Sequence, residues 1–343
     1  MTLQAPAALA RHRRELDEYL RDHLSRTDPA ILYRMVRYHL GWEEADGTPA
    51  AHGGKGLRSS LCLLACEATG GDWRRALPAA AALDLVHNFS LVHDDIQDRD
   101  RKRRDRPTVW SIWGEAQAIN AGDALLSLAR TALLRLEETG LSAETVLQAA
   151  RILDQRILEM VEGQVMDLSF EERLQVDSEA YLLMIAKKTG ALFDCALSLG
   201  ALAGGGAAPV VAAMARCGRE LGIAFQVRDD MLGVWGAENR TGKLPAADIR
   251  NRKKSLPVVY ALARAEGATA AELRRIYSQP QLSDSDVSIV LGALESVRAQ
   301  AHCRAAAEER RERALEELAR ADLRPDAAAE LRQVADFLLE RDY

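Results

Sequence analysis

Two clusters of aspartates are the side chains best suited to chemistry in this sequence. Asp94-Asp95-Ile96-Gln97-Asp98 follows the apolar stretch 89–92, and Asp229-Asp230 follows the apolar stretch 221–227. Because Asp94 and Asp98 are four residues apart, they share one face of a helix, about one turn apart. A partly buried pair of carboxylates needs positive charge nearby. Mg²⁺ typically joins one or two carboxylates to substrate phosphates, so the spacing favours a magnesium site for a phosphorylated ligand.

The alternative for each cluster alone is a solvated acidic turn, since acidic clusters are common on protein surfaces. The presence of two clusters favours the metal site. If both helices face one cavity, three or more carboxylates can hold several magnesium ions around a diphosphate, which neither cluster could do alone.

Basic residues near these clusters supply counter-charge for such a ligand. Lys55 and Arg58 follow Gly53-Gly54, where flexible backbone can approach an anion closely. Further candidates are Arg103, Arg104, Lys187, Lys188, Lys243, Lys253 and Lys254. Taken singly, each is most simply a solvated charge. A phosphate-binding P-loop is disfavoured, because Pro49 replaces its first glycine and Gly56 replaces the Ser or Thr after its lysine.

Helices are the elements that must position these residues. Ala, Leu, Arg and Glu dominate the chain, aromatic residues make up 5%, and the alternation typical of strands is scarce. Helical periodicity covers residues 7–40 and recurs from Leu57 to the end, and a turn-rich loop is expected over residues 41–54. We therefore expect an all-α, single-domain bundle over residues 1–343, with residues 1–28 as an N-terminal helical extension.

Composition excludes several other classes of protein. The net charge of −6 gives no overall attraction for nucleic acid. Five cysteines without a C-x-x-C pair argue against a zinc site or a disulfide framework, and suit a reducing cytoplasm. No signal peptide opens the chain. The uncharged run 195–215 is interrupted by glycines, which predicts two core helices joined by a turn and no transmembrane segment.

Taken in order, these segments resemble the trans-prenyltransferases, or polyprenyl synthetases, from about residue 30 to 340. Gly53-Gly54-Lys55 with Arg58 is similar to the family's G-G-K-x-x-R segment, and residues 94–98 to its first aspartate-rich motif. The later matches are Arg103-Arg104 with Pro107, Gln164 with Asp167, Lys188-Thr189, Phe225-Gln226 with Asp229-Asp230, and Lys243, Asp248, Lys253 and Leu256-Pro257. Several collinear motifs are far more specific than any one of them.

The resemblance implies a helical bundle of the isoprenoid synthase type around a deep central cavity, usually a homodimer. It implies that Asp94, Asp98 and Asp229 bind Mg²⁺, three ions per active site. It implies that the allylic diphosphate is held by Arg103, Lys188, Lys243 and Lys253, and isopentenyl diphosphate by Gly54, Lys55, Arg58, His87 and Arg104. Thr189 and Asp230 are further substrate-binding residues, and Gln226 steadies the developing cation.

The activity implied is condensation of isopentenyl diphosphate with an allylic diphosphate through an allylic carbocation. Bulk beneath the first motif should set product length. Phe89 is large, Ser90 is small, and the motif has no two-residue insertion, which resembles short-chain synthases that make geranylgeranyl diphosphate, with farnesyl diphosphate next.

The sequence departs from the family pattern at two positions. Gly233 stands where the second motif usually ends in Asp, and Gly56 stands at a position that is usually basic. A terpene cyclase is one alternative, but its second motif would want Glu at position 237, where Ala237 stands. A non-catalytic subunit is another, but it should have lost first-motif aspartates, which are intact here. We expect activity to survive both departures.

Overall fold

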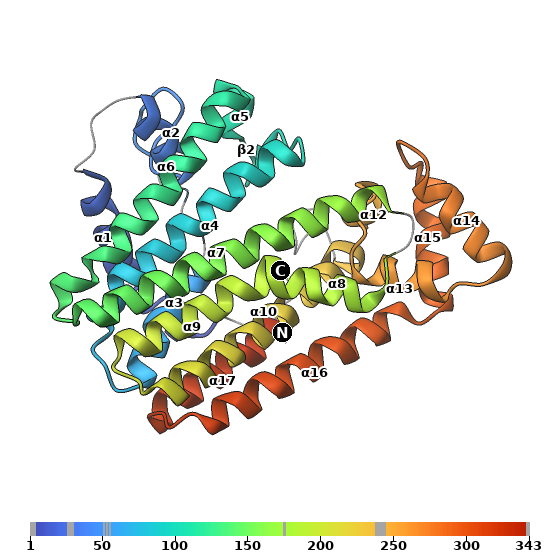
Figure 1. Ribbon diagram of the computed structural model, residues 1–343. Helices are drawn as coiled ribbons and strands as arrows, with labels where there is room; N and C mark the ends of the chain where they lie inside the picture. Colours follow the sequence, from blue (N-terminus) through green and yellow to red (C-terminus); the bar gives the residue numbers. More distant parts are fainter. Residues whose placement is uncertain are drawn as a thin grey trace.

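The computed structural model describes residues 5–25, 31–50, 52, 54, 56–173, 176–236 and 245–340 (Figure 1). Its α-helices are α1 (Arg13–Ser25), α2 (Ile31–His39), α3 (Leu57–Ala68), α4 (Leu77–Gln97), α5 (Val109–Trp113), α6 (Glu115–Leu134), α7 (Ala143–Glu172), α8 (Ser178–Ile185), α9 (Ala191–Ala203), α10 (Ala208–Trp235), α12 (Ala247–Arg250), α13 (Leu256–Arg264), α14 (Gly267–Tyr277), α15 (Asp284–Ser296), α16 (Ala299–Arg320) and α17 (Pro325–Glu340). Short turns of 3₁₀ helix lie at η1 (Ala7–Leu9), η2 (Trp73–Ala76) and η3 (Arg135–Thr139), and a π turn lies at η4 (Ala186–Gly190).

The centre of the bundle is built from helices with small residues at their contacts. Every residue of α9 is buried, and α9 packs between α3 and α10. A side chain at Gly200 would place its Cβ 2.1 Å from the carbonyl oxygen of Cys62, so glycine lets α9 and α3 approach this closely. The two core helices predicted over residues 195–215 are confirmed as parts of α9 and α10, joined by a turn at Gly204–Gly206.

The all-α prediction is confirmed, with one small addition. After the first aspartate cluster, β1 (Lys102–Arg103) pairs antiparallel with β2 (Arg106–Pro107). The two turn residues, Arg104 and Asp105, have φ of 52° and 61°, the left-handed values that a tight two-residue hairpin requires. Periodicity cannot reveal strands this short.

Other features of the described residues bear on the sequence predictions. The helical stretch over residues 7–40 is divided into η1, α1 and α2. All five cysteines are buried free thiols. Among the described helices, none combines the length and apolar character that a membrane crossing requires.

Candidate active site

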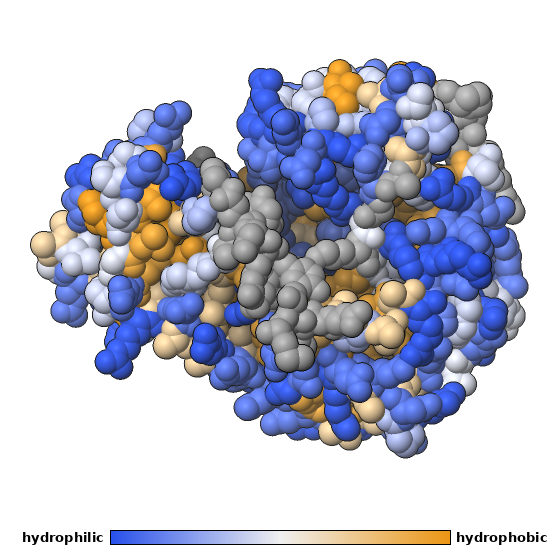
Figure 2. Space-filling model, turned by 180° about the vertical axis from the view of Figure 1, so that it is seen from behind, coloured by the Kyte–Doolittle hydropathy of each residue, from blue (hydrophilic) through white to orange (hydrophobic). Residues whose placement is uncertain are grey.

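The two aspartate clusters face one cavity. Helices α4, α7, η4 and α10 line a chamber of about 370 Å³ that holds Asp94 on one side and Asp229 on the other. On the face opposite that of Figure 1, the surface is hollowed, with mostly hydrophilic residues around the hollow and hydrophobic ones inside it (Figure 2). The arrangement suits a ligand with a charged head and an apolar tail. We call the cavity that contains Asp94 and Asp229 the acidic chamber.

The first cluster carries more negative charge than its surroundings compensate. Within the described ranges, the side chains of Asp94 and Asp98 make no hydrogen bond or ion pair. Burial raises the pKa of Asp94, and it raises the pKa of Asp98 to about 6. A cation in the chamber would relieve this cost.

Asp94 and Asp98 suit a metal ion that takes most of its coordinating oxygens from water and from substrate phosphates. No group of three or more Asp, Glu, His or Cys side chains in the described residues gathers into a metal cage. Mg²⁺ commonly keeps several waters and binds through one or two carboxylates plus substrate phosphates. An open carboxylate pair is the donor set that such binding needs.

The two aspartates of the second cluster lie in different surroundings. Asp229 lines the acidic chamber, whereas Asp230 is fully buried behind it. Asp230 accepts hydrogen bonds from the Tyr181 hydroxyl (2.5 Å), the Leu256 amide (3.1 Å) and the Gln226 amide (3.1 Å). Asp230 therefore holds Gln226 in place, and the structure places it away from the cavity surface.

The π turn η4 presents two polar residues to the acidic chamber. The Thr189 hydroxyl donates to Gln226 Oε1 at 2.8 Å, and Lys188 Nζ lies 2.6 Å from Asp167. Gly163 allows α7 to pack against this turn, because a Cβ there would lie 2.3 Å from the Lys188 amide nitrogen. Burial lowers the pKa of Lys188, but Asp167 and Asp94 outweigh it and the pKa is raised overall, so the residue stays cationic.

Lys253 brings positive charge to the second cluster. Its Nζ lies 3.9 Å from Asp230 Oδ1. Burial acts to lower the pKa of Lys253, but Asp230 and Asp248 outweigh burial and raise it. The lysine therefore remains charged beside the acidic chamber at neutral pH.

Gly233 is explained by the position of Asp248. A Cβ at residue 233 would lie 2.2 Å from Asp248 Oδ2 and 2.3 Å from its Cγ, so the carboxylate of α12 occupies the space of the missing side chain. Asp248 is 8% exposed, and its Oδ2 is buried and has no hydrogen-bond partner among the residues that the structure describes. A carboxylate is therefore present at this point in space, although another part of the chain provides it.

A second chamber of about 370 Å³ adjoins the first and is lined by basic groups. Arg58, His87 and Phe225 line both chambers, and Gly54 and Arg104 line only the second. Burial lowers the pKa of Arg58 to about 10, and its Nε is buried without a hydrogen-bond partner in the described part of the chain. We call this space the basic chamber, and its unpaired donors suit an anion.

Residues 46–294 of the 343 match the polyprenyl synthetase family. The chain belongs to that family. It is 38% identical to a farnesyl diphosphate synthase of Mycobacterium tuberculosis, covering 94% of this chain and 89% of that protein. It is 45% identical to a geranylgeranyl diphosphate synthase of the same organism, covering 75% and 72%. A polyprenyl synthetase structure from Streptomyces coelicolor superposes with a TM-score of 0.90 at 38% identity, covering 97% and 99%.

The predictions of a prenyltransferase and of an isoprenoid synthase fold are thus confirmed. Most of the predicted site residues that the structure describes come together around the two chambers of this polyprenyl synthetase. Gly53, Lys55 and Lys243 lie outside the described residues.

Two neighbouring arginines of this prenyltransferase have side chains with different surroundings. Arg104 lines the basic chamber. Arg103 lines neither chamber and donates from Nε to Asp95 Oδ1 at 2.7 Å. They diverge because Arg103 ends β1 while Arg104 begins the hairpin turn.

The spare basic residues Lys187 and Lys254 have partners away from both chambers. Lys187 pairs with Glu162 on α7. Lys254 Nζ donates to the carbonyls of Phe170 (2.7 Å) and Glu171 (2.9 Å), and so caps the C-terminal end of α7. Their roles in the described structure are to hold the helices that carry the site.

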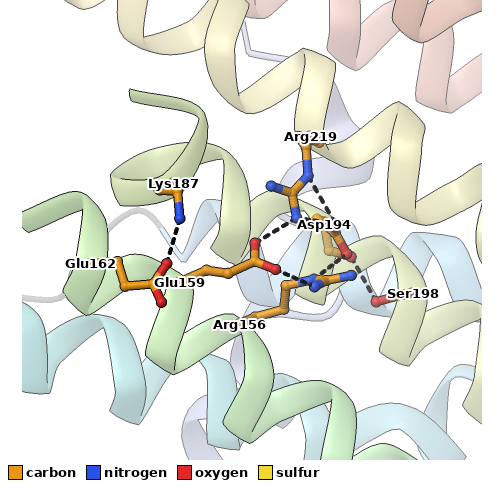
Figure 3. A network of polar contacts seen from close by, with 7 residues as sticks. All are labelled: Arg156, Glu159, Glu162, Lys187, Asp194, Ser198 and Arg219. Carbon is orange, nitrogen blue, oxygen red and sulfur yellow. Dashed lines mark hydrogen bonds and ion pairs between the residues drawn. The ribbon is translucent and has the colours of Figure 1, made fainter. Parts of the chain in front are cut away.

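A closed ring of charges joins α7, α9 and α10, three helices that each contribute residues to the lining of the acidic chamber (Figure 3). Buried Asp194 on α9 contacts Arg156 of α7 (2.9 Å) and Arg219 of α10 (2.9 Å). Glu159 closes the ring, at 2.7 Å from Arg156 and 2.6 Å from Arg219. Two guanidinium groups balance two carboxylates, so the ring joins three helices without net charge.

The arginines around the basic chamber also affect a histidine that the sequence did not single out. Burial lowers the pKa of His39 to about 3, with Arg103 and Arg104 adding to the effect. The unfolded chain has a histidine pKa near 6.5, so it binds the proton first as pH falls. Stability from neutral His39 is therefore present above about pH 6.5 and is lost as pH falls toward 3.

We expect His39→Gln to remove this pH dependence. Between pH 7.5 and 5.5 the wild-type protein should lose about 1.4 kcal/mol of unfolding free energy through His39, a loss that the variant lacks. Urea unfolding at both pH values measures the difference, with His52→Gln, at an exposed residue, as the control. Equal pH slopes for wild type and His39→Gln would show that His39 does not stay neutral in the fold.

Proposed function

We propose that this prenyltransferase condenses isopentenyl diphosphate with an allylic diphosphate, and that it extends farnesyl diphosphate to geranylgeranyl diphosphate. The adjoining chambers are the observation that carries the proposal. Asp94 and Asp229 line the acidic chamber, whereas three arginines line the basic chamber together with two aspartates, and the chambers meet at Arg58, His87 and Phe225. Two diphosphates can thus be bound apart, with their reacting carbons at the junction.

The allylic substrate belongs in the acidic chamber. Asp94, Asp98 and Asp229 would hold Mg²⁺, three ions in all. A geranylgeranyl diphosphate synthase of Corynebacterium glutamicum, 27% identical with a TM-score of 0.83, is complexed with isoprenyl diphosphate and magnesium, which supports this assignment. When bound, the metal would neutralise charge that develops on the leaving diphosphate. Lys188 and Lys253, with Lys243, would hold that diphosphate, and Arg103, which pairs with Asp95 next to Asp94, would add positive charge beside it.

The reaction follows from the placement of the two substrates. The allylic C–O bond breaks, its electron pair leaves with the diphosphate, and an allylic cation remains. Gln226, which Asp230 and Thr189 hold in position at the chamber, would steady that cation. The isopentenyl double bond attacks the cation, and the departing diphosphate takes the proton that is lost. Apolar residues such as Phe225 exclude water, which would otherwise trap the cation.

The isopentenyl substrate belongs in the basic chamber. Arg58, His87 and Arg104 would bind its diphosphate beside Gly54, with Lys55 as a further contact. Burial and the neighbouring arginines lower the pKa of His87 well below its ordinary value, so His87 is a neutral ligand at pH 7. This chamber also separates a synthase from a cyclase, which needs no isopentenyl site.

The direct test is incubation of the protein with Mg²⁺, isopentenyl diphosphate and farnesyl diphosphate, followed by dephosphorylation and mass spectrometry. We expect a C20 alcohol. Hydrocarbon formed without consumption of isopentenyl diphosphate would identify a cyclase instead. No reaction under any of these conditions would favour a non-catalytic subunit.

Product length is expected to depend on Phe89. It lies five residues before Asp94 on α4, about 7.5 Å along the helix, and its ring packs edge-on against His93 with centroids 4.9 Å apart. Removing this ring deepens the acidic chamber. We expect Phe89→Ala to shift products to C25 or longer, and Phe89→Leu to shift them less, as measured by mass spectrometry. An unchanged C20 product from Phe89→Ala would place the floor of the chamber elsewhere.

We also propose that the enzyme is a homodimer that works in the cytoplasm. Exposed apolar side chains outside the acidic chamber occur along α6 and α7, which follow one another around η3; they are Ile119, Leu134, Leu147, Leu158 and Val165. A second copy of this chain would cover them. The five buried free thiols suit a reducing compartment.

Leu158→Glu is therefore expected to produce monomers. The side chain is 61% exposed, and a charge there would be buried unpaired in a dimer. Sedimentation velocity measures the change, with Ile289→Glu on α15 as a control at an exposed apolar residue away from α6 and α7. A monomeric wild type, or a dimeric Leu158→Glu variant, would contradict the assigned interface.

A further inference from the structure

The N-terminal helix α1 reaches the basic chamber. Arg13 and Asp17, in its first turns, line this chamber together with Arg58 and Arg104. On the same helix Leu16, Leu20 and Leu24 are buried, so α1 is held against the body of the protein along its length. Arg13 is therefore positioned by packing.

The Arg13 guanidinium lies directly against Gly56. A Cβ at Gly56 would be 2.0 Å from Arg13 Nη1, and Gly56 has the left-handed φ of 57°. The Nε and Nη2 atoms of Arg13 pair with Asp17, at 3.2 and 2.8 Å. Among the described residues, its Nη1 is buried and has no hydrogen-bond partner. One donor of Arg13 is thus available to a ligand in the basic chamber.

Three guanidinium groups line this one chamber. Burial, Arg103 and Arg13 all lower the pKa of Arg104, which shows that the cations repel one another there. Asp17 and Asp84 line the same chamber and supply the opposing charge among its described residues. Buried donors without partners destabilise the site. A ligand with several anionic oxygens would relieve both the repulsion and the missing hydrogen bonds.

We propose that Arg13 binds the diphosphate of the substrate in the basic chamber, so that α1 forms part of the isopentenyl site. This inference rests on the assignment of isopentenyl diphosphate to that chamber. It also explains Gly56: the glycine leaves room for a cation from α1 at a position where a basic side chain is usual, so the charge is supplied from another segment.

The decisive measurement is isothermal titration of isopentenyl diphosphate, without allylic substrate, into wild type and Arg13→Gln. We expect affinity to fall about tenfold or more, since a charge-assisted hydrogen bond contributes about 1.5–3 kcal/mol. The KM for isopentenyl diphosphate should rise by a similar factor, while the KM for farnesyl diphosphate stays within twofold. Arg14→Gln, at an arginine with 80% of its side chain exposed, is the matched control and should match wild type.

Gly56→Ala tests the contact between Arg13 and Gly56 by changing the glycine instead of the arginine. Its methyl group would displace the Arg13 guanidinium, so isopentenyl affinity should fall although Arg13 is still present. Thermal unfolding of each variant separates a binding loss from a loss of fold. Arg13→Lys, which keeps the charge, should recover part of the affinity.

Comparison with Arg58→Gln distinguishes two kinds of failure. Unchanged affinity in Arg13→Gln, with a strong loss in Arg58→Gln, would overturn the role of Arg13 alone. Unchanged affinity in both variants would overturn the assignment of isopentenyl diphosphate to the basic chamber, and the role of Arg13 with it.

Discussion

Asp94→Asn is expected to lower kcat about a thousandfold while leaving the fold intact. Asparagine keeps the shape of the side chain but removes a charge that would hold Mg²⁺ where the diphosphate leaves. Loss of one well-placed group that stabilises developing charge costs about 10²–10³ in rate. Since burial raises the pKa of Asp94, removing its charge should not lower the melting temperature.

Steady-state kinetics across a range of Mg²⁺ concentrations, together with thermal unfolding, measures both effects. Asp154→Asn is the matched control, because that aspartate lies exposed on α7 and pairs with Arg130. A loss smaller than tenfold at saturating Mg²⁺ would remove Asp94 from the metal site. A large drop in melting temperature would instead give Asp94 a structural role.

Gly233→Asp is expected to damage the protein, although it restores the usual family residue. Its Cβ would lie 2.2 Å from Asp248 Oδ2, and its carboxylate would add a second buried negative charge at the same point. An uncompensated buried charge costs about 3–5 kcal/mol. We expect a loss of unfolding free energy of about this size, with activity falling in parallel.

Urea unfolding measures the loss, and Gly292→Asp on α15 is the control, because a Cβ at Gly292 would meet nothing within 4 Å. The double variant Gly233→Asp with Asp248→Gly should recover most of the stability, because it exchanges the two positions of the carboxylate. If the double variant is no better than the single one, Asp248 does not stand in for the missing side chain.

The sequence was sufficient to predict the helices and the main acidic groups. Apolar periodicity is a local property, and the interval between Asp94 and Asp98 places both on one helix face whatever the tertiary structure. The chambers and the contacts across them needed the structure. Arg13 and Gly56 are far apart in the sequence, and no local pattern predicts that they touch.

The different positions of adjacent residues within one motif could not be predicted from the sequence either. Asp229 and Asp230 are adjacent and chemically identical, yet helix rotation turns one to the cavity and the other to Tyr181. Arg103 and Arg104 separate because of a hairpin turn of two residues with positive φ, neither of them glycine. Such conformations are set by surrounding structure and are not marked by residue type.

The ring of Arg156, Glu159, Asp194 and Arg219 has a consequence for how such an enzyme can evolve. Asp194 is buried, so removing Arg156 or Arg219 leaves its charge with only one of its two guanidinium partners, and the ring resists change. On α4, by contrast, Phe89 is a single large apolar side chain among polar residues such as Ser90 and His93, and exchanging one apolar side chain for another usually costs little when volume is conserved. Substitutions can therefore accumulate at Phe89 while the ring stays fixed, so that related enzymes can differ in product length and keep the same catalytic groups.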